Sequence, residues 1–168
     1  MLIEISLIQK LILLLGSPTL TFSAVIAILL FSAGLGSFFS KYLTARIPMK
    51  MIGAAIFICS VLLFFILPGF ISALQGADIT VKILATLGLL LPQGLLMGVP
   101  FPTGLRLIGI QKKDEFVPVF WAINGWMSVV GSILALVLAM SFGYNVTLLA
   151  GALIYLGFAY HTRTLPKT

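Results

Sequence analysis

The chain has 168 residues, of which 61% are hydrophobic and only 8% are charged, and its formal net charge is +6. So few polar groups cannot cover the outside of a water-soluble globule, which excludes a soluble fold. The ten Lys and Arg residues are dispersed along the chain and form no basic stripe, so no nucleic-acid partner is expected. The single cysteine, Cys59, excludes an internal disulfide.

Apolar segments in succession predict an all-α integral membrane protein, a bundle of about six transmembrane helices that forms one domain over residues 1–168. A helix needs about 20 apolar residues to cross roughly 30 Å of hydrocarbon, so this length holds five or six spans and no separate catalytic domain. The first segment gives a helix of only about 21 Å, which is too short to span comfortably. The predicted spans are 2–15, 19–42, 49–74, 79–108, 117–141 and 144–160.

Prolines and small residues mark features inside these segments. Pro68, followed by Gly69, predicts a kink or an end in the third segment. Three prolines between residues 92 and 102 predict that the fourth segment is bent or unwound after Val99. Small residues four positions apart let helix backbones approach closely. Such pairs are Ser32 with Gly36, Gly94 with Gly98, and Ser128 with Ser132.

The basic residues predict the orientation, because cytoplasmic loops collect Lys and Arg. The opposite loops hold only Asp78 and, at a helix edge, Lys82. Six spans with both termini in the cytoplasm place every loop on the side that its Lys and Arg content predicts. Without the first span, the N-terminus would lie outside. The residues expected on the cytoplasmic side are Lys41, Arg46, Lys50, Arg106, Lys112, Lys113, Arg163 and Lys167.

Polar residues inside apolar segments are the candidate site, because ionisable groups in a bilayer are usually paired or line a polar cavity. Glu4 is either a cation or proton site near mid-membrane or a solvated end residue. Lys10 lies about 240° around the helix from Glu4, so the two need separate partners, and Lys10 is expected to snorkel to the outer interface. We predict one pocket, formed by Glu4, Gln9, Gln93, Asn124 and the cation-binding ring of Trp126. The alternative is that Gln93 and Asn124 only join helices.

Four blocks of sequence carry a resemblance to a known family. The blocks are LIEISLIQK (2–10), LFSAGLGS (30–37), GLLMGVPFPTGLR (94–106) and WAINGWMSVVGS (121–132). In this order they resemble the membrane part of the bacterial spermidine-synthase-like membrane proteins, in which an aminopropyltransferase-like domain is joined to transmembrane helices. The resemblance implies a truncated member that begins inside a family helix and lacks the soluble domain. That membrane part is similar in turn to half of a major-facilitator transporter, although the Asp and paired Arg of the usual transporter loop are missing here.

The expected function follows from this resemblance. It implies a module of the bacterial cytoplasmic membrane that anchors or assists an aminopropyltransferase-like partner and passes a small cationic or amphipathic molecule, such as a polyamine. The alternative is a half-transporter that forms a homodimer with twelve helices. The sequence contains no catalytic set, no metal motif and no cofactor-binding loop, so the chain alone is not expected to be an enzyme.

Overall fold

The structure is a computed structural model that describes residues 1–111 and 114–162. Every regular element in these residues is helical, which confirms the predicted all-α class. The basic residues Lys112, Lys113, Arg163 and Lys167, used above to predict orientation, lie outside the described residues. The helices are α1 (Leu2–Leu15), α2 (Pro18–Arg46), α3 (Met49–Leu74), α4 (Ile79–Met97), α5 (Pro100–Ile110) and α6 (Val117–His161), with a short 3-10 helix η1 (Asp114–Phe116).

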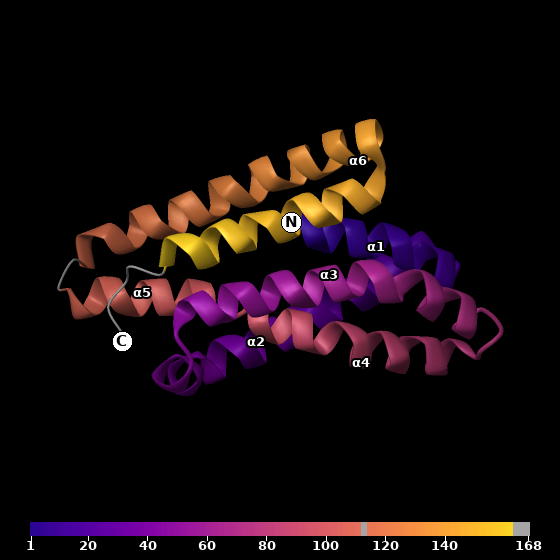
Figure 1. The fold of residues 1–168 in the computed structure, drawn as a ribbon, viewed down its shortest axis with the longest axis horizontal. Coiled ribbons are helices and arrows are strands. Elements are labelled where there is room, and N and C mark those ends of the chain that lie inside the picture. Colours follow the sequence, from indigo (N-terminus) through magenta and orange to yellow (C-terminus); the bar gives the residue numbers. More distant parts are fainter. Residues whose placement is uncertain (112–113, 163–168) are drawn as a thin grey trace.

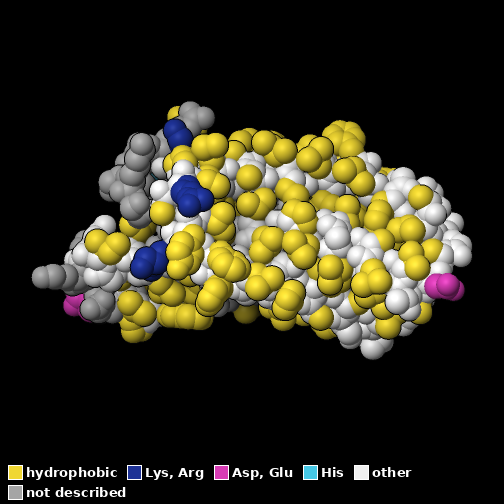
Figure 2. All heavy atoms as spheres, turned by 90° about the horizontal axis from the view of Figure 1, so that it is seen from below, with side chains coloured by type: hydrophobic (Ala, Val, Ile, Leu, Met, Phe, Trp, Pro, Cys, Tyr) yellow, Lys and Arg dark blue, Asp and Glu magenta, His cyan; other side chains and the backbone are white. Residues whose placement is uncertain are grey.

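The helices lie roughly along one long axis (Figure 1). The connection between α3 and α4 and the bend in α6 lie at one end of this axis, and the end of α5 and the start of α6 lie at the other. Four stretches of helix are long and apolar enough to cross a membrane, namely 18–46, 49–74, 79–110 and 117–161. The chain is therefore an integral membrane protein with several candidate spans. Apolar side chains cover the face on which α2 and α4 lie, and Lys and Arg gather towards one end of it (Figure 2).

Several predicted boundaries differ from those observed. The helix predicted over 19–42 continues to Arg46, because a charged helix end can extend beyond the hydrocarbon. The helix ends where the backbone of Ile47 becomes extended before Pro48. The predicted span 79–108 is divided into α4 and α5 at residues 98–99 and continues to Ile110, so the predicted break is found. The bounds of α3 are those predicted, 49–74, and the helix continues through Pro68, so this proline does not end it.

The predicted spans 117–141 and 144–160 fall within the single element α6. This element consists of two helices joined at Gly143, whose φ of 81° and ψ of 163° are not helical. Glycine adopts such a positive φ without the steric cost that a Cβ would bring. We call residues 117–142 the first half of α6 and residues 144–161 its second half, and Figure 1 shows that the chain reverses direction between them.

The short helix α1 lies at the centre of the bundle. It contacts α2, α3, α4 and both halves of α6. Its side chains Leu7, Leu11 and Leu14 are at most 2% exposed. The helix begins near the middle of the long axis and runs towards one end (Figure 1). The first turn of α1 therefore lies at about half the length of the bundle, in the region that a membrane would enclose.

Glycines bring α2 and α4 into close contact, as the small-residue pattern predicted. A Cβ added at Gly94 would lie 2.5 Å from the Cβ of Ser32. One added at Gly98 would lie 2.7 Å from the Cα of Ala33, and one added at Gly36 would clash with the carbonyl oxygen of Leu95. All these distances are shorter than side-chain carbons tolerate, so the backbones can approach this closely only because the Cβ atoms are absent.

Arg106 ties α5 to the end of α2. Its guanidinium donates hydrogen bonds to the hydroxyl oxygens of Ser40 (3.0 Å), Thr44 (3.1 Å) and Thr103 (3.0 Å). The side chain is half-buried, and it forms no ion pair within the described part of the chain. The planar guanidinium holds several N–H donors in a fixed fork geometry, which suits three hydroxyl acceptors. A lysine ammonium does not have this geometry.

Candidate functional site

A cavity of about 520 Å³ lies between the first turn of α1 and the two halves of α6. We call it the α1–α6 hollow. Most of its wall is apolar, and α2 and α4 each contribute to it through Ala33 and Met97. A mostly apolar wall with a few polar groups is typical of a small-molecule site. The lining residues used in the argument are Glu4, Met97, Asn124, Met127, Ser128 and Tyr155.

Glu4 is the only carboxylate among the described residues that line this hollow. It lies in the first turn of α1, where a negative charge is favoured by the helix dipole. Its side chain is 29% exposed, and one carboxylate oxygen lies 2.9 Å from the ammonium group of Met1. The hollow thus contains one carboxylate, which pairs with the ammonium group of Met1, beside apolar walls.

Asn124 and Ser128 bring polar groups to the hollow from the first half of α6. The Ser128 hydroxyl donates to the backbone carbonyl of Asn124 at 2.9 Å, so this hydroxyl is already engaged. The Asn124 side-chain amide, in contrast, forms no hydrogen bond with any described residue. Its carbonyl oxygen is therefore available to accept a hydrogen bond from a ligand.

The structure brings together only two of the five residues predicted for the polar pocket. Glu4 and Asn124 both line the hollow, whereas Gln9, Gln93 and Trp126 do not. Gln9 is exposed on α1, and Trp126 is 75% exposed on the outer side of α6. Trp126 follows Asn124 by two positions, or about 200° around a helix, which explains why the two face opposite ways.

Gln93 is fully buried close to the hollow but does not reach it. Its amide nitrogen donates to the hydroxyl of Ser60 at 3.0 Å and lies 3.4 Å from the sulfur of Met97. Its carbonyl oxygen is buried without a hydrogen-bond partner among the described residues. Because Met97 lines the hollow, Gln93 contacts the wall from behind and links it to α3.

Glu4 and Lys10 have separate partners, as predicted. The Lys10 ammonium donates a hydrogen bond to the side-chain carbonyl of Asn145, in the second half of α6. It also lies 5.7 Å from the centre of the Phe64 ring, within reach of a cation–π interaction. Lys10 therefore joins α1 to α3 and α6 instead of simply extending into solvent.

Sequence reasoning missed Tyr155, which lies in the second half of α6 and closes one side of the hollow. It is half-buried, and a tyrosine within the apolar run 148–160 was the available signal. Met97 and Met127 were missed as well. Their flexible side chains allow the wall to adapt to ligands of different shape.

The described residues contain no group of three His, Cys, Asp or Glu side chains that could bind a metal ion. Comparison with family models, with curated proteins and with solved structures finds no match to this chain. The predicted family membership therefore stays a prediction, and the geometry of the α1–α6 hollow provides the direct argument about function.

Proposed function

We propose that this chain is a membrane module whose α1–α6 hollow binds a small amphipathic amine. The observation that carries the proposal is the position of Glu4, the one carboxylate among the described residues that line this mostly apolar hollow. A carboxylate in apolar surroundings is costly unless a cation pairs with it, which favours amine binding there. Asn124 adds a hydrogen-bond acceptor, and the apolar walls suit a hydrocarbon chain between amine groups.

The four sequence blocks resemble the spermidine-synthase-like membrane proteins, and this resemblance is our reason for proposing an aminopropyltransferase-like partner. Aminopropyltransferases act on amines, so an amine-binding membrane module would work beside an aminopropyltransferase-like protein or domain in a bacterial cytoplasmic membrane. Anchoring or assisting that partner is the role we assign to the chain. Passage of the amine across the bilayer would extend the same role.

Spermidine binding to the purified chain in detergent tests the hollow. Glu4→Gln should weaken binding by about 1.5 kcal/mol, or roughly tenfold in Kd, because the charged partner of the ammonium is lost. Asn124→Ala should weaken it less. Gln9→Ala is the matched control, since Gln9 is a polar residue on the same helix outside the hollow. Isothermal titration calorimetry would measure each Kd, and unchanged binding in Glu4→Gln would refute the proposal.

A half-transporter that dimerises into a twelve-helix carrier is the second candidate. The break between α4 and α5 at residues 98–99 favours it, because Met97 at the end of α4 also lines the hollow. Broken helices next to a mid-membrane site are typical of transporters. Spermidine exchange by reconstituted vesicles, together with a dimeric mass in detergent, would favour the carrier over the accessory module.

The topology that we propose has six spans with both termini in the cytoplasm. Arg46 and Lys50 lie at one end of the bundle, and the exposed Asp78 immediately precedes α4 at the other, which agrees with the positive-inside rule.

Single cysteines in a Cys59→Ala background test this topology in bacterial cells. A cysteine at Lys50 or Glu115 should be protected from a membrane-impermeant maleimide in intact cells and labelled only after lysis. A cysteine at Ser17 or Asp78 should be labelled in intact cells, because these exposed residues lie in the predicted outer loops. Labelling of Glu115→Cys from outside would contradict the six-span arrangement.

A further inference from the structure

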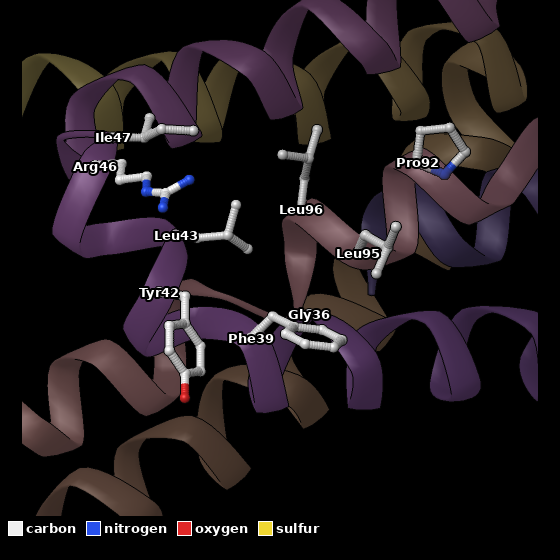
Figure 3. Close-up of a pocket in the computed structure, with 9 residues that line it drawn as sticks. All are labelled: Gly36, Phe39, Tyr42, Leu43, Arg46, Ile47, Pro92, Leu95 and Leu96. Atoms are coloured by element: carbon white, nitrogen blue, oxygen red, sulfur yellow. The ribbon is translucent and has the colours of Figure 1, made fainter.

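A second cavity, of about 740 Å³, lies between the end of α2 and the middle of the α4–α5 segment. We call it the α2–α4 groove. It does not share a lining residue with the α1–α6 hollow. Figure 3 shows its lining side chains. Those used in the argument are Gly36, Phe39, Tyr42, Arg46, Leu95 and Leu96.

The groove has an apolar interior and one cation. The side chains from α4 that line it are Pro92, Leu95 and Leu96, all apolar. Arg46 is the only charged residue among its described lining, and its guanidinium reaches inward over the groove from the end of α2 (Figure 3). Arg46 is exposed, and it forms no hydrogen bond or ion pair within the described part of the chain.

The groove lies at the level where a membrane meets water. Arg46 is the last residue of α2, and Lys50 lies in the first turn of α3, two positions after Pro48. Tyr42, one turn before Arg46, is 70% exposed. An exposed tyrosine beside basic residues at a helix end is typical of the lipid headgroup region. Moving away from Arg46 along the groove leads to Leu95 and Pro92, deeper in the apolar part of the bundle.

We propose that the α2–α4 groove binds one anionic phospholipid, with its phosphate on Arg46 and an acyl chain along Leu96 and Leu95. The charge of the free guanidinium is complementary to a phosphate, which planar guanidinium groups bind through paired hydrogen bonds. The apolar interior of the groove suits a hydrocarbon acyl chain, which is poorly soluble in water. Basic pockets between transmembrane helices on the cytoplasmic side are a known form of lipid recognition.

Native mass spectrometry of the full chain in detergent tests this site, because it resolves lipid adducts and dimers in one measurement. Added phosphatidylglycerol should bind as a single tight adduct, and phosphatidylcholine should bind more weakly. Arg46→Gln should reduce phosphatidylglycerol affinity about fivefold, since one surface cation contributes about 1 kcal/mol to anionic lipid binding. Leu96→Trp, which narrows the groove without a change of charge, should reduce adducts of both lipids.

Lys50→Gln is the matched control, because Lys50 is an exposed cation at the same end but does not line the groove. It should retain the phosphatidylglycerol adduct. Equal losses in Arg46→Gln and Lys50→Gln would overturn the site in favour of general surface attraction. Displacement of the lipid by inorganic phosphate alone would overturn the lipid assignment, and a dimer that forms in place of the adduct would assign the groove to a second copy of the chain.

Discussion

Gly98→Ala should destabilise the bundle by about 1–3 kcal/mol, because it adds a side chain at a closely packed position. The added Cβ would lie 2.7 Å from the Cα of Ala33, so the backbones of α2 and α4 would have to separate. Reversible unfolding in mixed detergent micelles would measure the loss.

Gly88→Ala is the matched control for this experiment, because Gly88 lies in α4, which Gly98 caps, and has no atom within 4 Å of an added Cβ. It should leave stability unchanged or raise it slightly. Gly36→Ala acts on the same helix contact from the α2 side, so the double variant with Gly98→Ala should lose less than the sum of the two single losses. Equal stability of Gly98→Ala and Gly88→Ala would contradict the close α2–α4 contact.

Arg106→Met should destabilise the bundle by about 2 kcal/mol, because it removes the guanidinium that donates to Ser40, Thr44 and Thr103. Methionine preserves an apolar side chain of similar length, so the loss reports mainly on the hydrogen bonds. Arg106→Lys should recover only part of the stability, since an ammonium cannot reach all three hydroxyls at once. The same unfolding measurement applies.

Lys50→Met provides the comparison for Arg106, as an exposed cation at the same end of the bundle. Its effect should stay within about 0.5 kcal/mol, as is usual for surface substitutions. Equal losses of stability in Arg106→Met and Lys50→Met would mean that net charge at this end stabilises the bundle. The hydroxyl contacts of Arg106 would then contribute nothing measurable.

Local signals in the sequence predicted most of the helix ends. Gly16, with a φ of 76°, ends α1, and Pro48 separates α2 from α3. The bend at Gly143 lies inside the predicted turn. The end of α2 was predicted four residues too early, because hydropathy falls at Lys41 while the helix itself continues to Arg46.

The candidate site was predictable only in part. A polar residue in an apolar segment can be recognised from sequence, and this identified Glu4 and Asn124. The direction in which each side chain points depends on neighbouring helices, and sequence does not provide it. Gln9 follows Glu4 by five positions, about 140° around the helix, so the two could not both face the hollow. The α2–α4 groove was not predicted, because its walls come from two helices that are far apart in sequence.

The central position of α1 also constrains the order in which the protein can be assembled. Helix α1 is synthesised before α6 and is enclosed partly by it, since Lys10 bonds to Asn145 and Ile3 packs beside Gly151. Until the ribosome has completed the second half of α6, Lys10 lacks this partner and one side of α1 is uncovered. Before that point α1 can pack only against α2, α3 and α4, so the addition of α6 completes the environment of α1.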